Sequence, residues 1–220
     1  MRIPDLGAVL FDLDGTLVDT APDLARALNA VLEEAGHPPL PLATVRPFVS
    51  HGARALVRRG FGLERGDPAF ERLRLRLLAL YRDSIARETA LFPGMEAVLE
   101  TLEGRSIPWG VVTNKPAWLT DPLLAALGLD RRAACAVSGD TTSNSKPHPE
   151  PLLYACRAAR VPPPRCVYVG DAERDVEAGR AAGLRTLVAL FGYLGPEDRP
   201  EGWGADGLLE HPSDLLEWLP

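Results

Sequence analysis

Lysine is scarce in this chain: of its 24 basic residues only two are lysines, Lys115 and Lys146, and the rest are arginines. Each lysine follows an apolar stretch and lies in a polar cluster, at residues 111–116 and 143–147. Lysine carries a compact, strongly hydrated point charge, whereas the arginine guanidinium is a planar fork. A chain that otherwise uses arginine would keep lysine where a small cation must lie beside an anionic group. Chance and a composition bias explain the two lysines equally well.

Cysteines, long apolar runs and an excess of positive charge are also lacking. The three cysteines (Cys135, Cys156 and Cys166) have no metal-ligand spacing, so we expect buried or half-buried free thiols in a reducing cytosol. No apolar run approaches about 18 residues and no signal-peptide pattern is present, so we expect a cytoplasmic protein that does not span a membrane. The formal net charge of −6 argues against a nucleic-acid partner. A monomer and a homodimer both remain open.

The N-terminal segment predicts a buried strand with carboxylates at its end. An apolar run at residues 8–11 is followed by Asp12 and Asp14, two positions apart and therefore on one face of an extended chain. Unpaired buried carboxylates are costly, so a purely structural role does not explain them. Gly15 then allows a sharp backbone turn.

Three later segments repeat this pattern of an apolar strand with a polar end. Residues 108–112 lead to Thr113, Asn114 and Lys115; residues 134–137 lead to Lys146; and residues 166–169 lead to Asp171 and Asp175. Helical patterns alternate with them at residues 95–102, 119–127, 149–159 and 176–182. This alternation predicts an α/β fold with a Rossmann-like parallel sheet, whose ligands bind at the carboxyl ends of the strands. We therefore expect one edge to collect Asp12, Asp14, Thr113, Lys146 and Asp171.

This set of side chains is suited to a hard cation and a phosphate group. Mg²⁺ prefers a few carboxylates together with waters and phosphate oxygens, and Asp12 and Asp171 are the candidate ligands. One carboxylate can act as a nucleophile and form an aspartyl-phosphate, while its neighbour serves as general acid and then base. Lys146 would neutralise phosphoryl charge, and Thr113 would hold the phosphoryl oxygens.

The four ordered motifs resemble those of the haloacid dehalogenase superfamily: Asp12-Leu-Asp-Gly-Thr, Thr113-Asn114, Lys146-Pro147 and Gly170-Asp171 with Asp175. The resemblance implies that Asp12 is the nucleophile and Asp14 the acid/base. It also implies that magnesium binds Asp12, Asp171 and the backbone carbonyl of Asp14. Asp175 fits two roles, either orienting a metal ligand or placing a charge at a helix N-terminus. Lys115 either contacts the substrate or balances the negative charge of the aspartates at this edge of the sheet.

Residues 17–90 interrupt this alternation and read as helices. Pro22 suits a first helical turn, and Phe70, Leu73 and Leu77 fit a helix better than the local strand-like alternation does. The segment resembles the helical cap of phosphoglycolate-phosphatase-like members of the superfamily. The catalytic core would then comprise residues 1–16 and 91–220. Caps close over the substrate and set specificity.

Two cap residues are candidate substrate ligands. His51 and Arg54 lie at a turn that enters a helix, and helix N-termini bind anions, although an exposed helix start is an equally good reading. Arg72, Arg74 and Arg76 are expected on a solvated helix face.

Residues 107–116 and 191–206 resemble the N-acetylmuramic acid 6-phosphate phosphatases of cell-wall recycling, with the phosphoglycolate phosphatases as the alternative. A dehalogenase would not need Asp14. A sugar phosphomutase and a non-catalytic ligand-binding protein are further alternatives.

Overall fold

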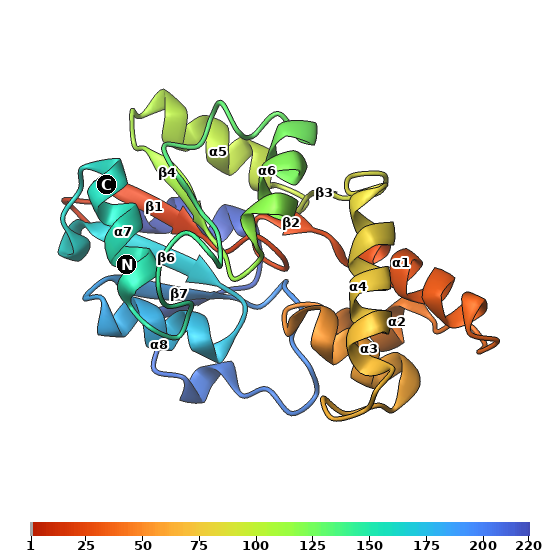
Figure 1. Ribbon diagram of the computed structural model, residues 1–220. Coiled ribbons are helices and arrows are strands. Elements are labelled where there is room, and N and C mark those ends of the chain that lie inside the picture. Colours follow the sequence, from red (N-terminus) through yellow and green to blue (C-terminus); the bar gives the residue numbers. More distant parts are fainter. Residues whose placement is uncertain (1) are drawn as a thin grey trace.

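The computed structural model describes residues 2–220 and has a six-stranded parallel sheet at its centre (Figure 1). The strand order is β5-β4-β1-β6-β7-β8. The strands are β1 (Ala8–Phe11), β4 (Trp109–Val112), β5 (Ala136–Val137), β6 (Cys166–Gly170), β7 (Arg185–Ala189) and β8 (Gly207–Leu209). The α/β class expected from the sequence is confirmed. Strands β7 and β8 were not predicted, because no polar tip of the kind shared by the other strands follows them.

Strand β1 lies inside the sheet, paired with β4 on one side and β6 on the other. All four of its residues are buried, which explains why it reads as a continuous apolar run. Ala8 and Leu10 face one layer, while Val9 and Phe11 face the other, as the alternation of a strand requires.

Helices cover both faces of the sheet (Figure 1). Helices α5 (Met95–Gly104) and α6 (Ala117–Ala126) pack on the face of Val9 and Phe11. Helices α7 (Glu150–Ala159) and α8 (Glu173–Ala181) pack on the opposite face. These four helices occupy the regions expected from the helical patterns. Four 3₁₀ segments complete the described helices: η1 (Arg46–Phe48), η2 (Pro163–Arg165), η3 (Pro200–Gly202) and η4 (Pro212–Trp218).

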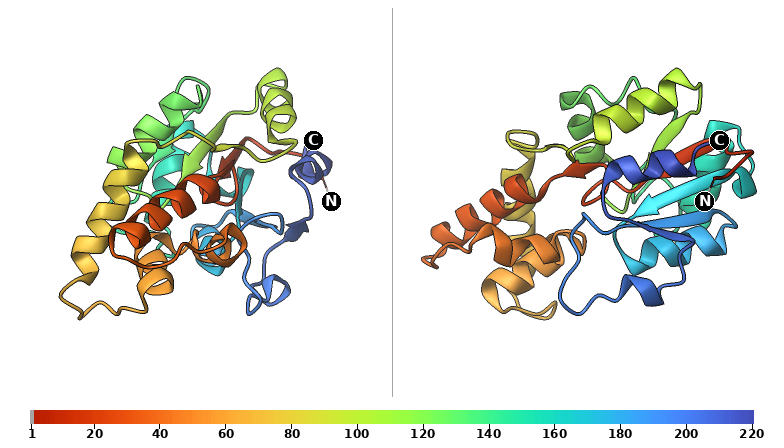
Figure 2. Two further views of the ribbon diagram at one scale, coloured as in Figure 1. Left: turned by 90° about the vertical axis from the view of Figure 1, so that its right-hand side faces the viewer. Right: turned by 180° about the vertical axis from the view of Figure 1, so that it is seen from behind.

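A separate group of helices lies to one side of the sheet (Figures 1 and 2). It comprises α1 (Ala21–Glu34), α2 (Leu42–Val45), α3 (Gly52–Phe61) and α4 (Phe70–Arg82). The segment begins at β2 (Val18–Asp19) and ends at β3 (Ala90–Leu91), which pair antiparallel and form its two connections to the core. Residues 70–82 form a helix, as the helical spacing of Phe70, Leu73 and Leu77 predicts, and not the strand that the local alternation of apolar residues would suggest. All four helices fall within the segment 17–90 that the sequence assigns to a cap.

The cysteines are free, with Cys156 and Cys166 buried and Cys135 half-buried, as expected. Within residues 2–220, no helix combines the length and apolar character that crossing a membrane requires.

Candidate active site

Asp12 follows β1 directly and is almost completely buried. Its Oδ1 accepts a hydrogen bond from the Leu13 N–H at 2.8 Å and lies 2.9 Å from Lys146 Nζ. Burial raises the pKa of Asp12, while the charge of Lys146 opposes that shift. The following turn depends on Gly15, whose φ is +87° and whose missing side chain leaves room for Asp171.

Asp14 lies beyond this turn and is held from two elements. Its Oδ1 accepts hydrogen bonds from the Thr20 hydroxyl at 2.6 Å and from Lys115 Nζ at 2.8 Å. Lys115 also lies over the ring of Tyr81 on α4, 4.7 Å from the ring centroid. Burial alone would lower the pKa of Lys115, but the charge of Asp14 holds that pKa above its usual range. The structure therefore pairs Lys115 with an acid of the site and also places it in the lining of the cavity described below, so its position fits both roles left open by the sequence.

Lys146 is buried beneath the site and makes four polar contacts. Its Nζ lies 2.9 Å from Asp12, 2.8 Å from Asp175, 3.0 Å from the Val112 carbonyl and 2.6 Å from the Tyr168 hydroxyl. Such contacts satisfy a buried ammonium group, which has three protons to donate.

Asn114 positions the Lys146 loop. The side-chain amide of Asn114 donates to the Lys146 carbonyl at 2.9 Å, and its oxygen accepts from the Lys146 N–H at 3.0 Å. Thr113 is buried beside it, and its hydroxyl accepts a hydrogen bond from the Lys115 N–H at 3.1 Å. Thr113 and Asn114 thus tie two polar strand ends together, and both also line the cavity described below.

Asp171 has one satisfied and one unsatisfied oxygen. Its Oδ2 accepts hydrogen bonds from Ser50 Oγ at 2.7 Å and from the Tyr193 N–H at 2.9 Å. Its Oδ1 is buried without a hydrogen-bond partner among residues 2–220. Burial and the charges of Asp12 and Asp175 raise the pKa of Asp171 to about 7. A buried carboxylate with an unpartnered oxygen among other acids is suited to a cation.

The acidic cluster contains both carboxylates expected to bind the metal, Asp12 and Asp171, together with Asp175, while the ligand expected from Asp14 is its backbone carbonyl. Ligand atoms of Asp12, Asp171 and Asp175 lie within 4.8 Å of one another, and the Asp14 carboxylate is not in this group among the described residues. The carboxylates of Asp12 and Asp171 therefore fit a divalent cation, whereas the Asp14 carboxylate is engaged by Lys115 and Thr20.

Asp175 lies at the helix N-terminus expected from the sequence, and its other contact is with a lysine of the site. It lies in the first turn of α8, where one carboxylate oxygen accepts the Ala172 N–H at 3.1 Å. The other oxygen is ion-paired with Lys146 at 2.8 Å. Asp175 thus caps a helix and orients a lysine of the site at the same time.

A cavity of about 380 Å³ lies between the core and the helical segment. The core contributes the ends of β1 and β4 together with α6, and the helical segment contributes α1, α3, α4 and the loop before α3. His51 and Arg54, the two candidate substrate ligands of the cap, line this cavity and are both exposed. Arg74 also lines it, so its assignment to a solvated face was wrong; helix α4 turns this one arginine inward while Arg72 and Arg76 stay exposed.

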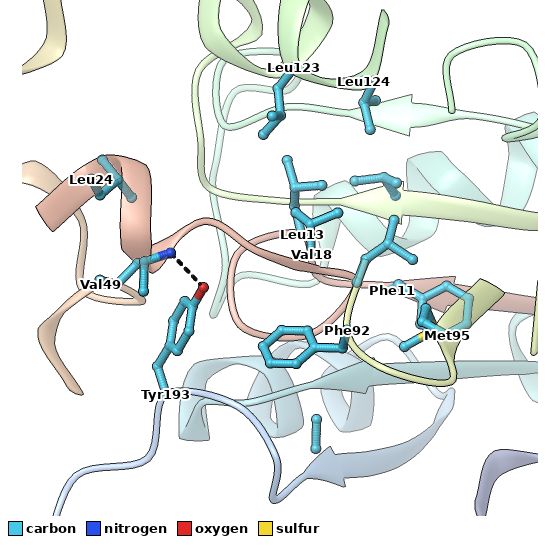
Figure 3. Close-up of a cluster of buried hydrophobic side chains, with 14 of the residues drawn as sticks. Phe11, Leu13, Val18, Leu24, Val49, Phe92, Met95, Leu123, Leu124 and Tyr193 are labelled. Atoms are coloured by element: carbon cyan, nitrogen blue, oxygen red, sulfur yellow. Dashed lines mark hydrogen bonds between the residues drawn. The ribbon is translucent and has the colours of Figure 1, made fainter. Parts of the chain in front are cut away.

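Three residues of the site were missed by sequence reasoning: Ser50, Arg174 and Tyr193. Arg174 lines the cavity, and its Nη2 donates to the Ser50 carbonyl at 2.7 Å. The Tyr193 hydroxyl donates to Asp19 at 2.8 Å and accepts the Ala21 N–H at 2.9 Å, which Figure 3 shows as a dashed line. The sequence could have indicated two of these residues, because Arg174 lies within the Gly170–Asp175 motif and Ser50 adjoins His51. Nothing in the sequence indicates the Tyr193 contacts.

Comparison with known proteins identifies the family. Residues 9–189 match the family model described as haloacid dehalogenase-like hydrolase. The chain is 44% identical over 210 residues to the N-acetylmuramic acid 6-phosphate phosphatase of Pseudomonas putida, covering 96% of this chain and 94% of that protein. It is 45% identical over 217 residues to a phosphoglycolate phosphatase of Xanthomonas campestris pv. campestris, covering 99% and 97%.

A solved structure shares the fold. The crystal structure of a predicted phosphoglycolate phosphatase from Haemophilus somnus superposes with a TM-score of 0.86 at 27% identity, covering 98% of each chain. The family match spans most of the sheet and both candidate catalytic aspartates. The chain therefore belongs to the haloacid dehalogenase-like hydrolases.

Proposed function

We propose that this protein is a magnesium-dependent phosphatase of the cytoplasm that hydrolyses N-acetylmuramic acid 6-phosphate. The observation that carries the phosphatase chemistry is the buried cluster of Asp12, Lys146 and Asp171 beside Asp14. The similarity over nearly the full chain to the P. putida enzyme of that name supports the substrate. The three free cysteines are consistent with a reducing compartment.

Asp12 is the proposed nucleophile. Its polar contacts from Leu13 and Lys146 both involve Oδ1, which leaves Oδ2 to attack phosphorus. The Oδ2–phosphorus bond forms as the ester bond to the sugar oxygen breaks, and Asp14 in its protonated form gives that oxygen its proton. Asp14 then takes a proton from water, the water oxygen attacks phosphorus, and the bond to Asp12 breaks with release of inorganic phosphate.

The remaining residues of the site balance negative charge and orient the phosphoryl group. Lys146 balances Asp12 and the phosphoryl oxygens, and Thr113 with neighbouring backbone N–H groups orients those oxygens. Asp12 and Asp171 would hold Mg²⁺ with the Asp14 carbonyl. When bound, the ion supplies positive charge that neutralises phosphoryl oxygens. Residues 17–90 would act as a cap that excludes water and contacts the sugar.

The Asp12→Asn variant tests the chemistry. We expect turnover to fall by at least ~10⁴-fold, because an amide is a poor nucleophile and the reaction has no substitute for this group. Phosphate release is the readout, and a melting temperature close to that of the wild type would exclude misfolding. A non-catalytic ligand-binding protein would show no turnover before substitution, and a phosphomutase would depend on a sugar bisphosphate.

The substrate is tested by comparing kcat/KM for N-acetylmuramic acid 6-phosphate and 2-phosphoglycolate at saturating magnesium. Phosphoglycolate is the second candidate because the X. campestris relative of that name is equally similar. A preference of ~100-fold for the sugar, or about 2.7 kcal/mol of discrimination, would support the proposal. A preference for phosphoglycolate would overturn the substrate and leave the phosphatase chemistry intact.

A further inference from the structure

One face of helix α4 forms a wall of the cavity. Arg74, Leu78 and Tyr81 all line it, and their spacing of four and three residues places them on one side of the helix. Tyr81 marks the catalytic end of this wall, because Lys115, the partner of Asp14, lies against its ring. Arg74 lies two helical turns away, which corresponds to about 10 Å along the axis.

Arg74 is a cation whose orientation is fixed by its neighbour. Its Nε donates to Glu71 Oε2 at 2.9 Å, and its Nη2 bonds the other oxygen of that carboxylate. Among residues 2–220 the contacts of Arg74 use only these two nitrogens, so both protons of Nη1 remain available. The Arg74 side chain is only 21% exposed, whereas Glu71 is 60% exposed. Glu71 therefore holds one edge of the guanidinium and leaves the other edge for a ligand.

Positive charge exceeds negative charge at this end of the cavity. The pKa of Glu71 lies below its usual value because Arg74 donates hydrogen bonds to it and because the charges of Arg74, Arg54 and Arg65 lie nearby. Three guanidinium groups thus lie near one exposed carboxylate, and two of them, those of Arg74 and Arg54, line the cavity. Arg54 lines the same cavity from α3. Planar guanidinium groups bind carboxylates in a bidentate manner.

The cavity also has an apolar lining. The apolar lining comes from the following residues: Leu24, Val49, Ala53, Leu78 and Leu119. The Tyr81 hydroxyl is buried without a hydrogen-bond partner among the described residues.

We propose that Arg74 and Arg54 form a carboxylate subsite for a phosphorylated sugar acid whose carboxylate is separated from its phosphate by ring atoms. The inference rests on the proposed function and specifies which group of the substrate the cap residues bind. In N-acetylmuramic acid 6-phosphate the lactyl ether on C3 bears the carboxylate and the phosphate is on C6, so ring carbons C3, C4 and C5 and the two substituent chains separate the anionic groups. In 2-phosphoglycolate a single carbon separates the carboxylate from the ester oxygen, too short to reach from the catalytic aspartates to Arg74.

The test uses two sugars that differ only in the lactyl ether: N-acetylmuramic acid 6-phosphate and N-acetylglucosamine 6-phosphate. The wild type should prefer the first in kcat/KM. Arg74→Gln should reduce that preference by roughly 10- to 100-fold, because the second sugar has no carboxylate for the guanidinium to bind. The loss should fall mainly on KM, since the lactyl group is remote from the reacting atoms.

Two variants control this result. Arg72→Gln removes an exposed arginine of the same helix and should leave the ratio between the two sugars at its wild-type value. Tyr81→Phe should lower kcat/KM for both sugars to the same extent, because its hydroxyl lies two turns from the proposed carboxylate. If Arg74→Gln left the ratio unchanged, or if Tyr81→Phe changed it as much as Arg74→Gln, the subsite would be overturned.

Failure of the subsite and failure of the proposed function give different results. A wild type that prefers the sugar acid, together with an Arg74→Gln variant that keeps this preference, overturns the subsite alone. Equal rates on both sugars in the wild type also reject the subsite while leaving a sugar-phosphate phosphatase. A wild type that hydrolyses neither sugar overturns both the proposed substrate and the subsite.

Discussion

Ser50 connects the helical segment to an acidic residue of the core. Its hydroxyl donates to Asp171 Oδ2 at 2.7 Å, while its carbonyl accepts from Arg174 at 2.7 Å. The hydroxyl therefore holds the oxygen of Asp171 that faces the helical segment and leaves Oδ1 for a cation. Groups that orient a metal ligand in this way influence affinity without touching the metal.

We predict that Ser50→Ala weakens magnesium affinity by roughly 10-fold, because the Asp171 carboxylate loses one of its two orienting donors. A magnesium titration by calorimetry measures this directly. Ser213→Ala, which removes an exposed hydroxyl from η4, is the matched control. Unchanged affinity in Ser50→Ala would show that Tyr193 alone suffices to orient Asp171.

At the scale of elements, Asp23 joins the beginning of the helical segment to its end. This residue lies in the first turn of α1 and is fully buried. Its Oδ2 accepts hydrogen bonds from the N–H groups of Glu88 and Thr89 and from the Thr89 hydroxyl, and Arg26 donates to its Oδ1 at 2.6 Å. One carboxylate thus fastens α1 to the strand that returns to the core.

We predict that Asp23→Ala lowers the free energy of unfolding by about 2–4 kcal/mol, because several buried donors lose their acceptor. Denaturant unfolding at pH 7 gives this difference. Glu33→Ala, on the exposed side of the same helix, should change stability by less than ~0.5 kcal/mol. Equal effects of the two substitutions would contradict the role of Asp23.

The contribution of Asp23 should also depend on pH. Burial would raise its pKa, but the hydrogen bonds from Arg26, Glu88 and Thr89 together lower it below the usual 3.8. A carboxylate whose folded pKa is depressed stabilises the fold above its unfolded pKa and loses that effect as pH falls through the folded value. The difference between wild type and Asp23→Ala should therefore persist from pH 7 to about pH 4 and shrink below it. Unfolding curves at a series of pH values test this, and a difference that is constant across the range would contradict it.

The sequence predicted elements better than contacts between them. The strands with polar ends, the flanking helices and the convergence of Asp12, Lys146 and Asp171 follow from periodicity and from the rule for parallel sheets. The inward turn of Arg74 and the contacts of Tyr193 depend on how the helical segment packs against the core, which periodicity does not specify. Strand β7 was not predicted because it lacks the polar end that marks the other predicted strands.

The acidic cluster links the stability of the fold to metal binding and to pH. Asp12, Asp171 and Asp175 are buried together, and the pKa of Asp171 is raised to about 7. An acid with a raised folded pKa destabilises the fold as pH rises from the unfolded pKa toward the folded one. A bound cation favours the ionised carboxylate and would reverse this effect.

We predict that magnesium raises the melting temperature, and that the increase is larger at pH 8 than at pH 6, because the ion competes with a proton for Asp171. Thermal unfolding with magnesium or with a chelator at both pH values provides the measurement. The Asp171→Asn variant should lose most of the increase at both pH values. An increase of equal size at pH 6 and pH 8 in the wild type would indicate that Asp171 is already ionised without the metal.

The position of β1 inside the sheet has a consequence for how the chain folds as it is made. This strand is wholly apolar and lies near the N-terminus, yet its partner β6 begins at Cys166. Roughly 150 residues must be synthesised between them, which takes about 8–30 s at typical elongation rates. During that interval β1 has no partner from β6, whereas the helices of residues 21–82 contact mainly one another and can assemble first. The helical segment would then fold before the catalytic site exists, because the site forms only after β6 pairs beside β1 and brings Asp171 to Asp12.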